Sequence, residues 1–320
     1  MLELHKAAQK QEIQQDLLYL IHHLHAADSS SEFLSLDSLA KIELLTAIEK
    51  KFAVCLEEHE IAEANTLDDL TEIILAKKKQ CKRLGSLLMK QTTNTSISFK
   101  KSLLRSIIHR FIREWAHSRF GIEVIESPCL PSEGPFILAA NHSSHLDNLA
   151  LMMGGSFDNY VLLAAKDYFY EPRSVRLFLL KKLFNLLPFE RSSVPSAMWN
   201  NINRCKAVIK ANKNLIIFPE ATRSLNGEIQ AFKGGCAMLA WELQVPIVPA
   251  YIHGTYNCLP KGTNWPKKGK IIVSFGTPIV TKNYVPNGTE LHYQYYKMIT
   301  QELEQQIKQL RDDLYVKEHL

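Results

Sequence analysis

The sequence predicts a chain in two parts, an all-helical segment followed by an α/β domain with a largely parallel sheet. Apolar residues up to about residue 76 recur with helical spacing, whereas short apolar runs alternate with helical stretches from about residue 120. Charge divides in the same way. Residues 1–76 hold 5 Lys and Arg against 15 Asp and Glu, a net charge of −10, and the remaining residues hold 33 against 18, a net charge of +15. An acidic module therefore precedes a basic one.

The composition limits the class of protein. A length of 320 residues suits about two domains, and no apolar run is long enough for a transmembrane helix. The first residues lack the apolar stretch of a secretory signal, and the six cysteines show no metal-ligand spacing. We therefore expect a cytoplasmic protein with reduced thiols and no metal. The basic surface favours phosphate groups on lipid, nucleotide or nucleic acid, and composition leaves these three open.

Each helix of the acidic part follows from its own pattern. Helical spacing predicts helices over residues 13–24 and 38–52, a short helix over Glu58–Ala64, and a last helix over Thr66–Ala76. Thr66 and Asp69 have the spacing of a capping box. A small acidic helical bundle that contacts other proteins is one interpretation of this segment.

A second interpretation comes from the stretch LSLDSLAKIELLTAIEKKFAVCLEEHEI and the later TLDDLTEII. Together they resemble acyl carrier proteins, which makes residues 1–77 an acyl carrier protein-like four-helix domain. The resemblance implies that Ser38 carries a covalent 4′-phosphopantetheine, attached by a phosphopantetheinyl transferase. Ser35 stands where these proteins commonly have glycine. The alternative for Ser38 is a helix-capping role alone.

Residues 78–99 are basic and then polar without periodicity, which predicts a linker. The following segment predicts an amphipathic helix. Its apolar stripe comprises Leu103, Leu104, Ile107, Ile108, Phe111, Ile112 and Trp115, with Lys and Arg mostly off the stripe. Such a helix can lie on an anionic membrane surface, which predicts a peripheral protein on the inner face of the membrane. Packing against its own domain is the alternative.

Five apolar runs predict the strands of the second part. They are Phe136–Ala140, Tyr160–Ala165, Asn214–Phe218, Pro246–Ile252 and Lys270–Phe275. Continuous apolar runs are typical of parallel strands that are buried on both faces. A long polar helix from about Thr289 to Leu314 closes the sequence. Reactive groups in such sheets lie just beyond the carboxyl ends of the strands, so motifs at these places are the candidates for chemistry.

The first motif, Asn141–Asp147, follows the run FILAA directly. A strand end followed by a helix start can bring Asp147 against His142. The carboxylate would then hold one imidazole nitrogen protonated and leave the other free as a base. That arrangement suits removal of a hydroxyl proton. His145 is a rival base, only two residues from Asp147.

The second motif, Phe218–Ser224, follows the run NLIIF. Arg223 offers a forked, permanently charged set of donors for a phosphate-bearing acceptor, and Glu220 can orient Arg223 or the acceptor. A surface salt bridge in a loop is the alternative.

In this order, NHSSHLD and FPEATRS resemble the blocks of the phospholipid/glycerol acyltransferase family, and three further segments fit: LPFER at 187–191, AFKGG at 231–235 and VPIVP at 245–249. The resemblance implies an acyltransferase domain over residues 100–320, with His142 and Asp147 as its catalytic pair. The substrate-binding residues that it implies are Arg191, Glu220, Thr222, Arg223, Lys233 and Gly234. Ala221 departs from the family's glycine, which matters if the position needs positive φ.

The implied function is transfer of a fatty acyl group from a thioester, either acyl-CoA or an acyl carrier, to the hydroxyl of lysophosphatidic acid or a related glycerophosphate or lysophospholipid. Two alternatives stay open: a carrier-linked acyltransferase with a non-glycerolipid acceptor, and a non-catalytic membrane scaffold. The absence of a nucleic-acid motif argues against a nucleic-acid partner.

Overall fold

In a computed structural model, the chain divides into two compact units, each considered by itself. One comprises residues 1–94, 192–200 and 286–295, and the other comprises residues 95–191, 201–285 and 296–320. The structure describes residues 2–24, 38–52, 54, 56, 64, 66–81, 103–125, 131, 134–155, 157–166, 184–190, 195–263, 265–284 and 293–318.

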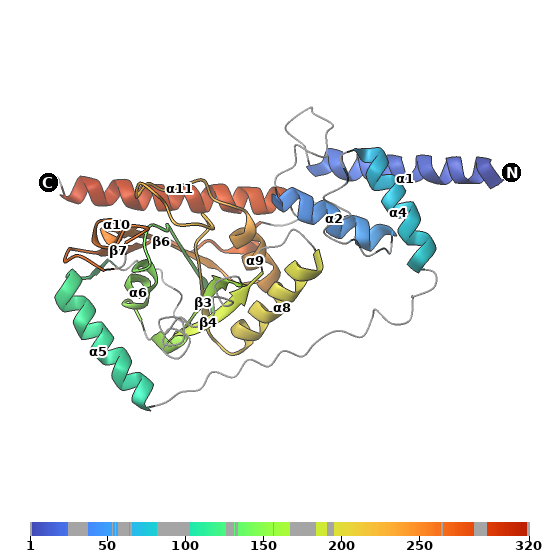
Figure 1. The fold of residues 1–320 in the computed structure, drawn as a ribbon. Helices are drawn as coiled ribbons and strands as arrows, with labels where there is room; N and C mark the ends of the chain where they lie inside the picture. The colour runs from blue at the N-terminus through green and yellow to red at the C-terminus, as the bar shows by residue number, and fades with distance from the viewer. Residues whose placement is uncertain are drawn as a thin grey trace. The chain divides into compact units, whose positions relative to one another are not determined.

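The first unit contains helices α1 (Leu2–Leu24), α2 (Ser38–Phe52) and α4 (Leu67–Cys81) (Figure 1). Side chains at helical spacing on each helix build one core, whose fully buried members include Leu17, Leu44, Leu45, Ile48, Leu70 and Ile74. These helices occur where the apolar periodicity predicts them, although α1 begins well before residue 13 and α4 runs to Cys81, into the predicted linker 78–99. The predicted short helix Glu58–Ala64 lies outside the described residues, apart from Ala64.

The start of α4 has the reciprocal bonds of the predicted capping box. The backbone N–H of Asp69 donates to Thr66 Oγ1 at 3.1 Å, and the N–H of Thr66 donates to Asp69 Oδ2 at 2.9 Å. Each bond satisfies a donor that the first helical turn leaves without an intrahelical partner.

The second unit is built on a seven-stranded sheet with the order β1-β7-β6-β2-β5-β3-β4. The strands are β1 (Glu123–Ile125), β2 (Ile137–Ala140), β3 (Tyr160–Ala165), β4 (Asn185–Phe189), β5 (Asn214–Ile217), β6 (Ile247–His253) and β7 (Ile272–Phe275). From β6 to β4 all pairs are parallel, β7 runs antiparallel to β6, and β1 is parallel to β7. The predicted α/β unit with a largely parallel sheet is confirmed.

The apolar runs behave as expected for central strands. All residues of β2 and β7 are buried, and in β6 only His253 is partly exposed. Two strands were not predicted. β1 has only three residues and includes exposed Glu123, and β4 contains Pro188. Both are edge strands, where a charge and a proline are tolerated because one side of the strand has no ladder partner.

The helices of this unit are α5 (Leu103–Phe120), α6 (Asp147–Met152), α9 (Gly235–Leu243) and α10 (Thr255–Cys258), with parts of α8 (Pro195–Lys210) and α11 (Tyr293–Glu318). In α11, the buried residues Ile299, Leu303 and Ile307 recur every four positions and so form one apolar face. Among the helices that the structure describes, none is both long and apolar enough to span a bilayer.

Strand pairing brings the two motifs together. β2 pairs in parallel with β5, with Ile137 opposite Leu215 and Ala139 opposite Ile217. Because their carboxyl ends meet at one edge of the sheet, the segments 141–147 and 218–224 emerge side by side.

Candidate active site

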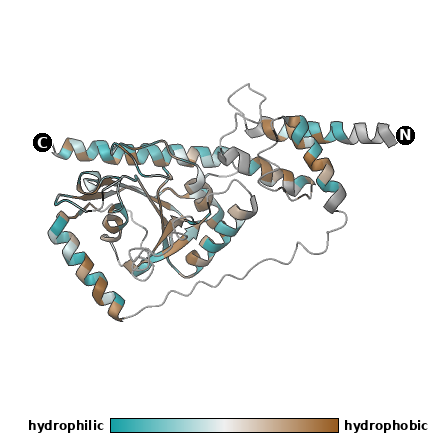
Figure 2. Ribbon diagram, viewed as in Figure 1, coloured by the Kyte–Doolittle hydropathy of each residue, from teal (hydrophilic) through white to brown (hydrophobic). Residues whose placement is uncertain are grey.

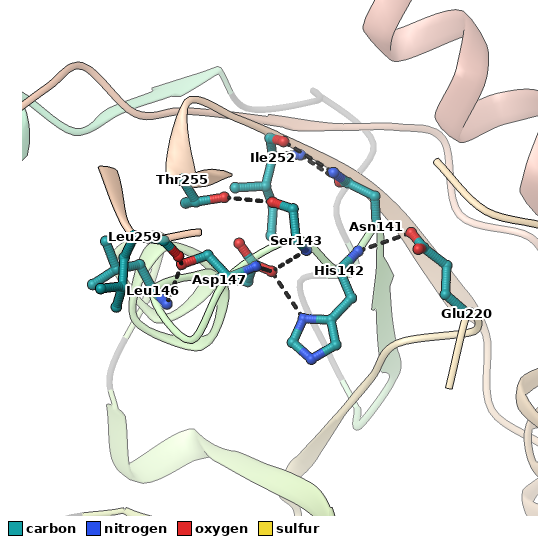
Figure 3. A network of polar contacts seen from close by, with 10 residues as sticks. Asn141, His142, Ser143, Leu146, Asp147, Glu220, Ile252, Thr255 and Leu259 are labelled. Carbon is teal, nitrogen blue, oxygen red and sulfur yellow. Dashed lines mark hydrogen bonds and ion pairs between the residues drawn. The ribbon is translucent and has the colours of Figure 1, made fainter. Parts of the chain in front are cut away.

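A histidine and a buried aspartate form the centre of this edge. His142 Nδ1 lies 2.8 Å from Asp147 Oδ2, and the side chain of Asp147 is completely buried at the first position of α6 (Figure 3). The backbone N–H groups of Ser143 and Ser144 donate to the same oxygen at 2.7 and 2.8 Å. Three donors thus fix the carboxylate. Since the carboxylate accepts the Nδ1 proton, the second ring nitrogen, Nε2, keeps a free lone pair.

The imidazole of His142 is also held by an aromatic contact. Its ring stacks on Phe218 with centroids 3.9 Å apart and planes 11° apart. Phe218 follows β5, so this contact joins the two motifs. Only 16% of the His142 side chain is exposed, and Figure 3 shows its second nitrogen turned away from Asp147. The ring therefore has one orientation, with Nε2 available to a substrate.

Glu220 fixes the backbone of His142. Its Oε1 accepts the N–H of His142 at 2.9 Å, while the carbonyl of His142 accepts the N–H of Ser224 at 2.7 Å. Burial raises the pKa of Glu220 to about 7, opposed by the backbone N–H groups of His142 and Gln230, and the charge of Asp147 adds to the rise. Glu220 is thus a positioning residue for His142, while its contact with an acceptor stays a prediction.

Three neighbouring side chains tie the histidine loop to β6 and α10. The Asn141 amide donates to the carbonyl of Ile252 at 3.0 Å and accepts the N–H of Ile252 at 2.8 Å. The hydroxyls of Ser143 and Thr255 lie 3.0 Å apart, and the Ser144 hydroxyl donates to the carbonyl of Leu259 at 2.7 Å. These roles of Asn141, Ser143 and Ser144 were not predicted from the sequence. The polar residues around His142 were the signal, but their partners lie more than 100 positions further along the chain.

The rival base, His145, is placed differently. His142, not His145, makes the contact with Asp147. Desolvation and then the charge of Arg223 lower the pKa of His145 to about 4, with a further contribution from His142. A neutral His145 is a weak base at neutral pH, so the geometry and the charges both favour His142.

Only some of the predicted substrate-binding residues lie near this site in the structure. Arg223 is near enough to act on His145, and within the described part of the chain its guanidinium has no carboxylate partner. Thr222 and Lys233 are exposed, and the backbone N–H of Lys233 donates to the carbonyl of Pro219 at 2.9 Å. Gly234 directly precedes α9. Arg191 lies outside the described residues, so its position is not part of this geometry.

Ala221 has a backbone conformation that explains the glycine of related motifs. Its φ is +59°, in the left-handed region, and its N–H closes a turn with the carbonyl of Phe218 at 3.0 Å. A β-carbon is unfavourable in this region by about 1–2 kcal/mol. The departure from glycine therefore places local strain beside Glu220.

No group of three or more His, Cys, Asp or Glu side chains that could hold a metal occurs among the described residues. Ser38, the predicted attachment point of the cofactor, is the first residue of α2 in the other unit.

These features define an α/β domain in which a buried carboxylate orients His142, with an arginine close to the neighbouring His145. In line with this class, residues 121–253 match the family model described as Acyltransferase. A 1-acyl-sn-glycerol-3-phosphate acyltransferase of Cocos nucifera is 34% identical over 149 residues, which are 46% of this chain and 47% of that protein. The human 1-acyl-sn-glycerol-3-phosphate acyltransferase beta is 31% identical over 45% of this chain and 51% of its own length. The chain spans about half the length of the curated relatives it matches.

Among solved structures, the chain is similar to the 1-acyl-sn-glycerophosphate (LPA) acyltransferase PlsC of Thermotoga maritima. The two are 25% identical, with a TM-score of 0.46, over 63% of this chain and 80% of that one.

The raised pKa of Glu220 predicts a pH-dependent stability. The folded chain binds the proton of the Glu220 carboxyl group more tightly than the unfolded chain does. The stabilisation that this proton gives is therefore fully present below about pH 4.5 and is lost as the pH rises through about 7. We expect the unfolding free energy of the wild type, relative to that of Glu220→Gln, to fall by on the order of 3 kcal/mol from pH 4 to pH 8. Urea denaturation at both pH values measures this.

Glutamine keeps an oxygen that accepts the N–H of His142, so the variant removes the proton and preserves the bond. Glu114→Gln, at an exposed position on α5, is the control. Parallel pH curves for the wild type and Glu220→Gln would contradict the argument.

Proposed function

We propose that the chain is an O-acyltransferase that moves a fatty acyl group from a thioester to the free hydroxyl of lysophosphatidic acid. The observation that carries the proposal is the 2.8 Å contact of His142 Nδ1 with buried Asp147, which leaves Nε2 as the basic nitrogen. The charge of Arg223 acts on the nearby His145. The names of the similar proteins support the choice of acceptor. Glycerol 3-phosphate, another lysophospholipid and a non-glycerolipid acceptor are the alternatives.

The reaction needs one base and no covalent enzyme intermediate. Nε2 of His142 takes the proton of the acceptor hydroxyl, and the negative charge of Asp147 stabilises the imidazolium that forms. The hydroxyl oxygen attacks the thioester carbonyl to give a tetrahedral intermediate. When the intermediate collapses, the C–S bond breaks and the thiolate takes the proton from His142. The products are an ester and a free thiol, and the histidine is neutral again.

Arg223 is the cation we assign to the acceptor. Arginine binds a phosphomonoester through two parallel hydrogen bonds, and this guanidinium is not occupied by a carboxylate among the described residues. Arg191, Thr222, Lys233 and Gly234 keep the binding roles that the family resemblance implies.

The donor is proposed to arrive on the acidic N-terminal unit. Ser38 begins α2, the place where an acyl carrier protein bears 4′-phosphopantetheine, and residues 1–76 carry a net charge of −10. A tethered acyl group reaches a high effective concentration at the basic acyltransferase domain, residues 100–320, through the part of the predicted linker that follows α4. Free acyl-CoA is the alternative donor.

Helix α5 is the proposed membrane-binding element. One face packs on its own unit, since Arg105 pairs with Asp158 at 3.1 Å and Arg113 donates to the carbonyl of Met153 at 2.9 Å. The other face carries exposed large apolar side chains, namely Leu103, Leu104, Ile107, Phe111 and Trp115. The apolar and polar residues along α5 are visible in Figure 2. An exposed apolar stripe on a helix that also carries the exposed Arg110 suits the surface of an anionic bilayer.

Loss of the base predicts loss of transfer. We expect His142→Ala to abolish acyl transfer and Asp147→Asn to lower kcat by about 10⁴-fold, because the tautomer of His142 is no longer fixed. Single-turnover transfer from acyl-CoA to lysophosphatidic acid measures both rates. His145→Gln is the matched control and should retain most activity. If His145→Gln loses transfer as completely as His142→Ala, the assignment of the base is wrong.

Removal of the apolar stripe predicts weaker membrane binding. The double variant Phe111→Ser, Trp115→Ser should lower affinity for vesicles of phosphatidylglycerol and phosphatidylcholine by at least about tenfold, because two exposed apolar anchors are lost. Cosedimentation measures the affinity. Val316→Ser, at an exposed apolar position on α11, should leave binding unchanged. Equal binding by all three proteins would exclude α5 as the anchor.

The carrier proposal predicts a modification at one serine. Incubation with CoA and a broad-specificity phosphopantetheinyl transferase should add one phosphopantetheine mass to the wild type and none to Ser38→Ala, as read by intact-protein mass spectrometry. Modification of the Ser38→Ala protein, or no modification of a folded wild type, would refute the carrier role and leave free acyl-CoA as the donor.

A further inference from the structure

A small basic cavity lies next to the candidate active site and has no role in the chemistry described above. Its volume is about 310 Å³, at the lower end of the range for small-molecule sites, and His253, Gly254, Asn257, Lys268, Gly269 and Lys270 contribute to its wall. None of its lining residues is acidic. Lys270 is paired with Glu123 at 3.0 Å, whereas Lys268 has no ion-pair partner in the described part of the chain. The cavity therefore offers one unpaired cation, an imidazole and an amide.

The backbone fixes the wall of this cavity. Gly254 has φ +85°, and a β-carbon there would lie 2.0 Å from the carbonyl oxygen of Lys270. A β-carbon at Gly269 would lie 2.6 Å from the sulfur of Cys258. The backbone N–H of Lys267 donates to the carbonyl of Cys258 at 2.8 Å. Two glycines thus allow the segment before β7 to approach α10 closely, and this approach shapes the wall of the cavity.

The same short helix joins the cavity to the catalytic loop. Thr255 and Leu259 hold the hydroxyls of Ser143 and Ser144, while Asn257 and Cys258 line the cavity. The strand order also relates the cavity to Arg223. β2, which leads to His142, lies between β5 and β6. Arg223 follows β5 on one side of it, and the cavity follows β6 on the other.

We propose that this cavity binds the phosphate group at the 4′ end of the acyl donor's phosphopantetheine arm. The inference rests on the proposed function, in which both substrates carry phosphate. Arg223 is the cation assigned to the acceptor, so a basic site across the catalytic strand suits the donor. CoA and a carrier-bound arm share this phosphate, and its anionic oxygens match the ammonium of Lys268 and the donors of Asn257 and His253.

The test compares donors with and without phosphate. We expect Lys268→Gln to raise KM for acyl-CoA and for acyl-phosphopantetheine about fivefold, the factor for an exposed charge pair, and to leave KM for acyl-pantetheine unchanged. Lys267→Gln is the matched control, because Lys267 is exposed and adjacent but does not line the cavity. Equal effects of the two variants, or a shift in KM for lysophosphatidic acid instead of the donor, would overturn the proposal.

A binding measurement separates this inference from the proposed function. Calorimetric titration of the full chain with CoA, without an acceptor, should show weaker binding for Lys268→Gln and unchanged binding for Lys267→Gln. Lys268-dependent binding of CoA without any acyl transfer would refute the function and support the site. Normal transfer with CoA binding that is indifferent to Lys268 would refute the site and leave the function standing.

Discussion

The carboxylate of Asp147 is the contact on which the rest of the site depends. One buried oxygen receives the His142 ring N–H and the backbone N–H groups of Ser143 and Ser144. Those two backbone bonds fold the chain tightly between β2 and α6, and that fold alone lets residues five positions apart meet. The same atom therefore shapes the loop and sets the tautomer of His142, the proposed base, so that a change at Asp147 alters the loop and the tautomer together.

The parallel sheet supplies further contacts that hold the loop between β2 and α6. Because β5 and β6 flank β2 in parallel, their carboxyl ends bring Glu220 to one side of His142 and Ile252 to the other. Glu220 accepts the backbone N–H of His142, whereas the backbone of Ile252 bonds with the side-chain amide of Asn141, and neither residue needs to touch a substrate. His142, the proposed base, is thus oriented by residues that follow or belong to three strands, and such preorganisation lowers the reorganisation that proton transfer would need.

The sequence predicted what depends on local spacing. Buried strands are apolar along their whole length, which is why β2, β3 and β6 were predicted. The His142–Asp147 contact could be predicted because the two residues are only five positions apart, between the end of a strand and the start of a helix. The edge strand β4 was missed because Pro188 interrupts a strand pattern. The partners of Asn141 and Ser144 were missed for a different reason. Both are backbone carbonyls or amides, so no side chain marks them, and only the pairing of β2 with β6 brings them close.

The turn after β5 combines a strained backbone at Ala221 with a buried carboxyl group at Glu220. The left-handed backbone at Ala221 turns the chain after β5 so that Glu220 faces the N–H of His142 and Arg223 lies near His145. A residue with a β-carbon tolerates this conformation only because neighbouring bonds over-determine it. These bonds include the two that clamp His142. Hence the segment that follows β5 and the backbone of His142 hold each other in place through the bonds to Glu220 and Ser224, so a change that disorders one should disorder the other.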